Sequence, residues 1–236
     1  LKLVAGFDFP DVERDYEFVS VCHPHEYPFN EGHVVSSKGL DIPPQQYDAH
    51  FEEYHVKRSN ALHSRHLGHG AYLTGPLARY SLNSSRLSPL GQAAAATAGL
   101  GPTCNNPFRS IVIRAVEVVY AFDEALRIID AYEEPDRPFV DAPMRAGVGC
   151  AATEAPRGML YHRYRLDPEG SVLDAKIVPP TSQNQPSIEE DLRDFATRWI
   201  DLPDARLGHL CEQAIRNHDP CISCATHFLK LDVVRQ

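Results

Sequence analysis

The chain has 236 residues, 43% hydrophobic and 23% charged, which is usual for a globular domain with a buried core. Its 32 acidic residues against 23 Lys and Arg give a net charge of −9, which argues against a protein that binds nucleic acid through the phosphate backbone. The longest apolar run, residues 111–120, is interrupted by Arg114 and Glu117 and is too short for a membrane span.

The first hundred residues are rich in His, Pro, Gly and Ser, and they predict short elements joined by loops. Brief strands are expected at residues 33–35 and 40–42, and a helix is expected over residues 43–54. A further helix is expected over residues 88–99, because a serine can cap it, a proline suits its first turn and a glycine can end it.

The strongest helical pattern begins at Asn106-Pro107, which again form a cap and first-turn pair. Apolar side chains then recur at helical spacing on one face, at Ile111, Ala115, Val118, Val119, Phe122, Leu126 and Ile129. Val112, Val116 and Ile128 widen this stripe. We therefore expect this helix to lie deep in a bundle, with a Pro-rich linker after it.

A β-hairpin is expected from residues 159–166 and 171–178, joined by the turn at residues 167–170 and stopped by Pro179-Pro180. These patterns together predict an α+β fold that is mainly helical. Its first part, residues 1–105, should be loop-rich. Its second part, residues 106–236, should hold a helical core and the hairpin.

Two further helices are expected near the C-terminus. Residues 187–190 form a capping box that predicts a helix start, and a last helix is expected over about 204–217. Pro220 disfavours helical geometry at Asp219, so the chain should leave the helix there. Cys221 would then lie in a turn just past a helix end.

The six cysteines are too sparse for a disulfide scaffold, and only Cys221 and Cys224 are close together. Reduced thiols and a cytoplasmic location are therefore expected. Two thiols separated by two residues can converge on one metal from a tight turn. The residues alone leave three kinds of site open: half of a zinc site, a dithiol redox pair, or part of a larger metal centre.

Other cysteines and histidines predict less. The spacing of three between His63, His66 and His69, with glycines nearby, favours solvated loop histidines over a zinc cluster shared with Cys22, His23 and His25. Packed thiols are expected at Cys104, Cys150 and Cys211.

The cysteine pair lies in a longer signature. Residues 219–227, Asp-Pro-Cys-Ile-Ser-Cys-Ala-Thr-His, resemble the C-terminal signature of nickel–iron hydrogenase large subunits. Residues 150–158, Cys-Ala-Ala-Thr-Glu-Ala-Pro-Arg-Gly, resemble a second signature of that family, and residues 177–181, Ile-Val-Pro-Pro-Thr, resemble a third. Three signatures in the right order are far more specific than one.

The resemblance extends over essentially the whole chain. Residues 9–11, 36–40 and 106–108 resemble the cytosolic, nicotinamide-linked branch of the family. The resemblance therefore implies the large-subunit fold, of which residues 1–236 would be the C-terminal portion.

The resemblance also implies a centre of nickel and of iron that carries cyanide and carbon monoxide. Cys221 would be a terminal nickel ligand and Cys224 a bridging one, and soft thiolates suit both metals. Arg157, preceded by Pro156, would donate a hydrogen bond to a cyanide. Asp219 would pair with Arg157 and steer the cysteine loop. On sequence alone, Arg157 could instead be a surface arginine and Asp219 a plain helix-end aspartate.

Further roles follow from the same resemblance. Thr181 or Ser182 would donate to the second cyanide, and the extra proline at 180 leaves the choice open. His227 matches a histidine that binds a structural magnesium after a maturation endopeptidase removes the C-terminal tail, here residues 228–236.

The family's N-terminal signature, Arg-x-Cys-Gly-x-Cys, has no counterpart in this chain, because Cys22 is followed by His-Pro-His. That signature supplies the other two nickel thiolates, so we expect a fragment that is inactive by itself. In the full assembly the resemblance implies reversible dihydrogen oxidation, with electrons leaving through an iron–sulfur small subunit to NAD(P)-reductase subunits. Two alternatives are a metal-free, quinone-reducing respiratory complex subunit of the same fold and a zinc-stabilised binding module. The intact cysteine pair counts against the first.

Overall fold

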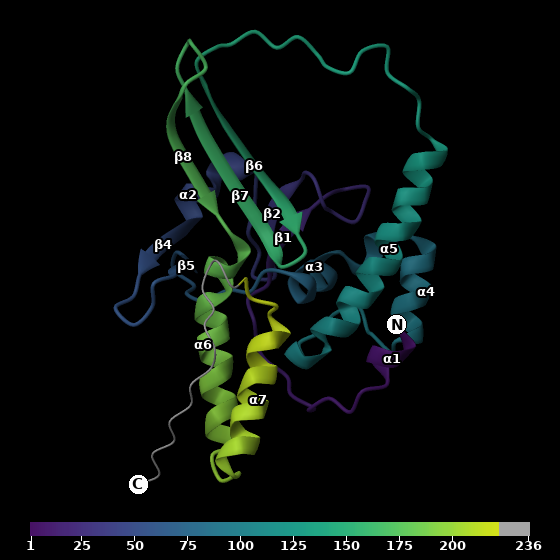
Figure 1. Ribbon diagram of the computed structural model, residues 1–236, viewed down its shortest axis with the longest axis vertical. Coiled ribbons are helices and arrows are strands. Elements are labelled where there is room, and N and C mark those ends of the chain that lie inside the picture. Colours follow the sequence, from purple (N-terminus) through teal and green to yellow (C-terminus); the bar gives the residue numbers. More distant parts are fainter. Residues whose placement is uncertain (222–236) are drawn as a thin grey trace.

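The computed structural model describes residues 1–221, in which helices and small antiparallel sheets are mixed (Figure 1). The helices are α1 (Lys2–Ala5), α2 (Tyr47–His50), α3 (Pro76–Asn83), α4 (Pro89–Thr97), α5 (Ser110–Asp130), α6 (Pro180–Arg198) and α7 (Asp204–Asn217), with 3-10 turns at Pro44–Gln46, Ser84–Arg86 and Pro107–Arg109. The strands are β1 (Val19–Cys22), β2 (His33–Ser36), β3 (Asp41–Ile42), β4 (Phe51–His55), β5 (Leu62–His66), β6 (Gly147–Ala155), β7 (Gly158–Leu166) and β8 (Val172–Val178). The expected α+β class is confirmed.

The strands form three antiparallel sheets in the described part of the chain, ordered β1-β2-β3, β4-β5 and β6-β7-β8. The last sheet is the long one that stands above α6 and α7 in Figure 1. Its β7–β8 hairpin was expected from the sequence. Its β6 strand was not, because residues 147–155 are rich in Gly and Ala and show no alternation of apolar and polar side chains. Ala155 pairs with Gly158, so Pro156 and Arg157 alone form the β6–β7 turn.

The helix expected over residues 43–54 is wrong in its second half. The helical part ends at His50, and Phe51 takes an extended backbone with φ −126° and ψ 139°. Phe51 then pairs with His66 as β4 meets β5. Its ring is buried against Tyr47 and Tyr72, so tertiary burial of this aromatic side chain determines the strand.

The start expected for α6 is also wrong, since the helix begins at Pro180 and not near Ser187. Pro180 occupies the first turn, where its missing N–H costs nothing. Ser187 lies inside the helix, and its hydroxyl donates to the Tyr72 carbonyl at 2.9 Å instead of capping a helix end. The expected stop of β8 before Pro179-Pro180 and the bounds of α7 are confirmed.

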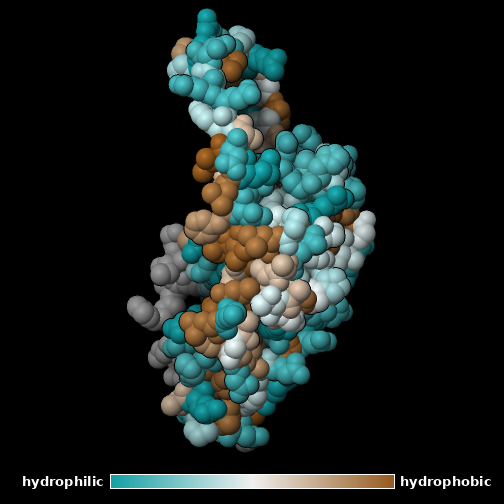
Figure 2. Space-filling model, turned by 90° about the vertical axis from the view of Figure 1, so that its right-hand side faces the viewer, coloured by the Kyte–Doolittle hydropathy of each residue, from teal (hydrophilic) through white to brown (hydrophobic). Residues whose placement is uncertain are grey.

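The helix α5 was placed correctly, but its buried face was not. The buried apolar side chains are Val112, Ile113, Val116 and Tyr120, on the side of α5 that packs against α3 and α4. Phe122, Leu126 and Ile129 are 70%, 61% and 67% exposed. Figure 2 faces this side and shows a band of apolar side chains across it. The outer stripe is therefore not covered by any of residues 1–221. Within the same residues, no helix is both long and apolar enough to span a bilayer.

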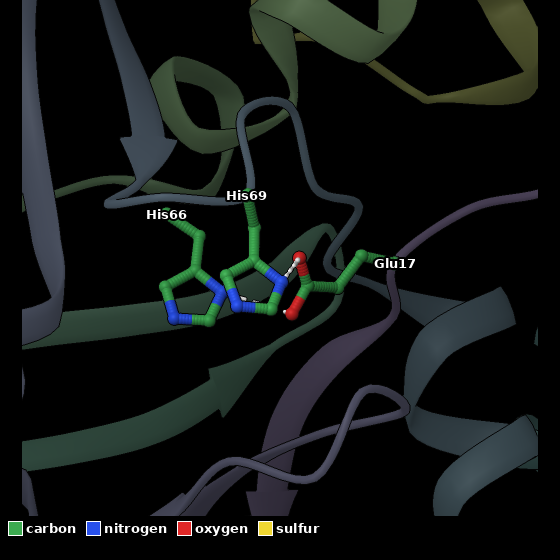
Figure 3. Close-up of side chains that lie close together, drawn as sticks. All are labelled: Glu17, His66 and His69. Atoms are coloured by element: carbon green, nitrogen blue, oxygen red, sulfur yellow. Dashed lines mark hydrogen bonds and ion pairs between the residues drawn. The ribbon is translucent and has the colours of Figure 1, made fainter.

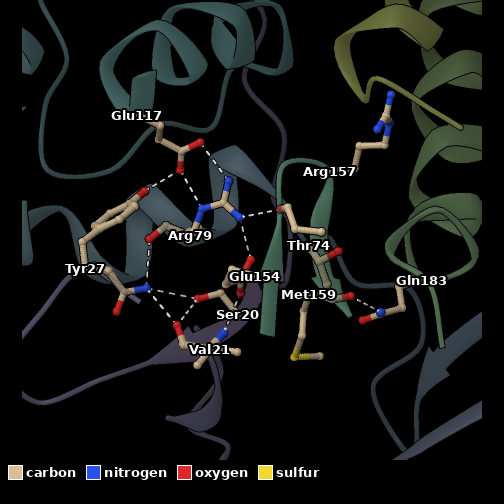
Figure 4. A network of polar contacts seen from close by, with 12 residues as sticks. Ser20, Val21, Tyr27, Thr74, Arg79, Glu117, Glu154, Arg157, Met159 and Gln183 are labelled. Atoms are coloured by element: carbon tan, nitrogen blue, oxygen red, sulfur yellow. Dashed lines mark hydrogen bonds and ion pairs between the residues drawn. The ribbon is translucent and has the colours of Figure 1, made fainter. Parts of the chain in front are cut away.

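A buried ionic network joins α3, α5, β6 and β1 (Figure 4). Arg79 donates through Nε and Nη2 to the Glu117 carboxylate at 2.7 and 2.8 Å, and through Nη1 to Glu154 at 2.7 Å. The Tyr27 hydroxyl also donates to Glu117, at 2.6 Å, and the Val21 N–H donates to Glu154, at 2.8 Å. One guanidinium thus forms ion pairs with two buried carboxylates.

Burial raises the pKa of Glu154 from its ordinary value near 4.5 to about 7, against the opposing effect of Arg79. The folded state therefore holds this proton more tightly than the unfolded state. The stabilisation that this bound proton gives to the folded state is complete below pH 4.5 and is lost as the pH rises through 7.

We expect Glu154→Gln, which mimics the protonated acid, to remove this pH dependence. The difference in unfolding free energy between the variant and the parent should change by about 3 kcal/mol between pH 4.5 and pH 8. Denaturant unfolding at several pH values measures it. A constant difference across that range would show that Glu154 is ionised throughout.

Candidate metal centre

Three segments that are distant in the sequence meet at one point: the β6–β7 turn, the end of α7 and the start of α6. Arg157 Nε donates to the Asp219 carbonyl oxygen at 2.7 Å and lies 3.5 Å from the Asp219 carboxylate. The Cys221 N–H donates to Thr181 Oγ1 at 3.3 Å. The structure therefore brings Arg157, Asp219, Thr181 and Cys221 together, including the pairing of Arg157 with Asp219. Their roles toward metals stay predictions.

Asp219 holds an unusual backbone conformation at this point. Its φ is 46°, and among residues 1–221 it is the only non-glycine residue with a positive φ. Arg114 from α5 lies 3.5 Å from the same carboxylate and also donates to the Asn217 carbonyl, at 3.0 Å. The Ser110 hydroxyl donates to that carbonyl at 2.6 Å. Several contacts thus hold the chain in a conformation that would be strained if it were free.

His218 connects this segment, residues 217–219, to α6. Its side chain is buried, and its Nε2 lies 3.0 Å from Asp191 Oδ2. Asp191 also accepts from Arg14 Nε at 2.8 Å and from the Tyr16 hydroxyl. Burial and then the neighbouring Asp191 raise the pKa of Tyr16, so this hydroxyl remains a donor. Neither Asp191 nor His218 could be found from the sequence, because Asp191 lies in α6, His218 follows α7, and no local pattern marks such a pair.

The position of Arg157 depends on close packing beneath its turn. Asn184 from α6 accepts from the Thr74 N–H at 2.8 Å and donates to the Arg157 carbonyl at 3.5 Å. Gly158 has φ 141°, and a Cβ on it would lie 2.3 Å from Thr74 Oγ1. Only glycine fits there without displacing the turn. In Figure 4 the Arg157 side chain points away from this packing and toward the end of α7.

Gly158→Ala is expected to damage the site without removing any of its polar groups. The added methyl should cost about 1–3 kcal/mol in stability through overpacking. By shifting Arg157, it should also lower, about 100-fold, the hydrogen-dependent dye reduction that the family resemblance implies for the full assembly. The matched control is Gly149→Ala in β6, where a Cβ meets no atom within 4 Å. Equal activity of the two variants would contradict this prediction.

The neighbouring hydroxyls Thr181 and Ser182 differ in what they contact. Ser182 Oγ donates to the Pro179 carbonyl at 3.0 Å and lies 3.3 Å from Glu53 Oε1, so its proton is used within the protein. Thr181 Oγ1 accepts from Cys221, and its own proton is donated to none of residues 1–221. Of the two candidates that the sequence left open, Thr181 is the one next to the cysteine loop.

The other expected residues have mixed outcomes. Cys224 and His227 lie outside the described residues. Cys104 and Cys211 are buried and Cys150 is partly buried, as expected for packed thiols. The expectation of solvated histidines is wrong for His63 and His66, which are buried. Carboxylates from distant segments satisfy them, Glu189 at 2.9 Å and Glu17 at 2.8 Å.

Comparison with known protein sequences finds hydrogenase subunits. No protein-family model matches the chain. Sulfhydrogenase 1 subunit alpha of Pyrococcus furiosus is 29% identical over 201 residues, which cover 84% of this chain and 46% of that protein. The beta subunit of the NAD-reducing hydrogenase HoxS of Cupriavidus necator is 31% identical over 170 residues, covering 68% of this chain and 35% of the relative.

Solved structures show the same fold. A crystal structure of an NAD+-reducing NiFe hydrogenase in the H2-reduced state aligns with a TM-score of 0.74 and 22% identity, over 92% of this chain and 51% of the other. A NiFeSe hydrogenase variant from Desulfovibrio vulgaris Hildenborough aligns with a TM-score of 0.57 and 24% identity, over 83% of this chain and 48% of the other.

The fold is that of the large subunits of nickel–iron hydrogenases. The relatives identified by sequence agree with this fold, and the chain belongs to the nickel–iron hydrogenase large-subunit family. It spans about half the length, or less, of the curated relatives it matches.

Proposed function

We propose that this chain supplies two thiolates, Cys221 and Cys224, to the nickel–iron centre of a hydrogenase that oxidises dihydrogen reversibly. The observation that carries the proposal is that Arg157 contacts Asp219 while Thr181 contacts the backbone of Cys221, two residues further along the same segment. These residues come from three separate signatures, and the fold brings them to the segment where the family resemblance expects the metals.

The donor set fits such a group. Thiolates are soft ligands that suit nickel and low-spin iron. Among residues 1–221, no hydrogen bond is made by the two terminal nitrogens of Arg157, so they are available to a ligand on iron, such as cyanide. The Thr181 proton is available in the same way. This supports cyanide, which accepts hydrogen bonds, as a ligand of the iron beside the carbon monoxide that the resemblance implies. It also supports Thr181 as the second donor in preference to Ser182.

When bound, the metal centre supplies the Lewis acidity that polarises dihydrogen for heterolytic cleavage. The residues of this chain would hold the metals and orient the groups around them. Cys221 would hold nickel through Sγ, and the same sulfur would take up the proton that heterolytic cleavage releases. Asp219 keeps Arg157 facing the centre, while Arg114 balances the negative charge of Asp219. Pro156 shapes the two-residue turn that carries Arg157.

The rest of the enzyme belongs to the same proposal. The names of two relatives, an NAD-reducing hydrogenase and an NAD+-reducing NiFe hydrogenase, support NAD(P) as the final acceptor. Electrons would then pass through an iron–sulfur small subunit to NAD(P)-reductase subunits in the cytoplasm. The exposed apolar stripe of α5 supports function within a larger assembly. His227 would bind a structural magnesium once a maturation endopeptidase has removed residues 228–236.

Metal analysis of the purified assembly tests the proposal. We expect nickel and iron together in the parent, and loss of nickel in Cys221→Ala and Cys224→Ala. Infrared bands of metal-bound cyanide and carbon monoxide should disappear with the nickel. Zinc as the sole metal would instead indicate a zinc-stabilised binding module. A folded assembly whose large subunit holds no metal would indicate the metal-free respiratory relative.

A further inference from the structure

A second group of metal-ligand side chains lies apart from the cysteine loop, between the segment before β1 and the turn after β5 (Figure 3). His66 Nδ1 lies 2.8 Å from Glu17 Oε1, and His69 Nδ1 lies 3.5 Å from Glu17 Oε2. The two imidazole rings stack with centroids 4.3 Å apart and planes 11° from parallel. One ligand atom from each of the three residues lies within 4.8 Å of the others.

The backbone fixes both sides of this group. His66 and Gly70 exchange two N–H···O hydrogen bonds, each of 2.9 Å, and Gly68 supplies the left-handed φ of 81° that closes the turn. Both rings therefore project to the same side. On the other side, the Leu73 N–H donates to the Glu17 carbonyl at 2.8 Å, which holds Glu17 opposite the turn. The group is thus preorganised before any ligand arrives.

Glu17 provides an independent indication of a missing partner. Its side chain is 1% exposed, and its Oε2 atom receives no hydrogen bond from residues 1–221. A buried carboxylate oxygen without a partner is costly and uncommon in folded proteins. His69 Nδ1 lies 3.5 Å from this oxygen, and the His69 side chain is 41% exposed. A cation bound between Glu17 and the two rings would satisfy this oxygen, and the exposed edge of His69 leaves room for a water ligand.

We propose that Glu17, His66 and His69 form a structural site for a divalent cation of borderline softness, Zn²⁺ above all. Two imidazoles and one carboxylate are a ligand set of zinc, with a water in the fourth position. Ligand atoms about 2.1 Å from one zinc lie roughly 3.4 Å apart, so a separation of 4.8 Å between ligand atoms needs to shorten by about 1.4 Å. The bound ion would tie the β4–β5 hairpin to the start of β1. The alternative is a pair of plain histidine–carboxylate contacts.

The test uses the full 236-residue chain with Cys221→Ser and Cys224→Ser, so that zinc bound by the cysteine pair does not contribute. Zinc titration by calorimetry, with elemental analysis after gel filtration, should show binding that His69→Ala weakens by roughly 100-fold or more. Loss of an outer-shell partner alone costs 10–100-fold, and His69 would be a direct ligand. Glu17→Gln should weaken binding similarly. Cobalt in place of zinc should give the visible absorption of a four-coordinate site without thiolate charge transfer.

The matched control is His55→Ala, an exposed histidine at the end of β4 that lies outside the group. Circular dichroism checks that each variant is folded, and the exposure of His69 makes its alanine variant tolerable to the fold. Equal zinc affinity in the His69 and His55 variants would overturn the proposal. A folded cysteine-free chain that binds no zinc would overturn it too, and would leave the nickel–iron proposal untouched.

Discussion

Replacing Cys221 by alanine is expected to lower hydrogen-dependent dye reduction by the assembled enzyme at least about 1000-fold. Removing a group that acts directly in the chemistry of a site has effects of this size or larger. The variant would lose both a metal ligand and the base that we propose for proton release. Cys224→Ala should have the same effect because it removes a second ligand. Dye reduction under hydrogen, normalised to the amount of assembled complex, measures both.

The control for this prediction is Cys211→Ala. That thiol is buried in α7, only ten residues before Cys221, and it packs without a metal role. Its loss should cost about 1 kcal/mol of stability through a small cavity and leave the activity largely intact. Retained activity in either Cys221→Ala or Cys224→Ala would overturn the proposed function. Equal loss of activity in all three variants would point to unfolding of α7 instead.

The parts of the site that depend on neighbouring residues could be predicted from the sequence. Pro220 ended the last helix where expected, and the Pro-Arg-Gly turn at residues 156–158 could be recognised from its signature. The contacts of Arg114 and Asp191 with residues 217–219 could not. They join helices whose relative placement a single sequence does not encode in any local pattern. These two residues are nonetheless among those that hold the cysteine loop in place.

The same difference between local patterns and contacts of distant residues decides which parts of the fold could be predicted. The caps of α4 and of the 3-10 turn Pro107–Arg109, which leads into α5, are local. Both are present, with Ser88 accepting from Gly91 and Asn106 accepting from Phe108. Periodicity alone could not tell which apolar face of α5 meets this chain and which stays outside it. Residues 51–55 form a strand because Phe51 is buried, and His66 is buried because Glu17 reaches it from before β1. In each case tertiary contacts outweighed the local preference.

Arg79→Met is expected to destabilise the chain by about 3–5 kcal/mol at neutral pH. Methionine fills much of the same volume, but it leaves Glu117 and Glu154 buried without their shared cation, and removing one partner of a buried ion pair costs this much. That is a large part of the 5–15 kcal/mol that usually holds a domain folded. The loss should be smaller near pH 5, where the unpaired carboxylates can take up protons. Chemical unfolding followed by circular dichroism at both pH values measures the effect.

Arg65→Met is the matched control, because Arg65 pairs with Glu52 on the surface and should contribute at most about 1 kcal/mol. A cost for Arg79→Met no larger than that of the control would show that the buried network does not stabilise the fold.

The network also has consequences for the site. Glu117 lies three residues after Arg114 on α5, and Glu154 lies three residues before Arg157 in the β6–β7 hairpin. Arg79 therefore holds together the two elements whose arginines meet at Asp219. At temperatures where the variant is still folded, its hydrogen-dependent activity should consequently fall well below that of Arg65→Met.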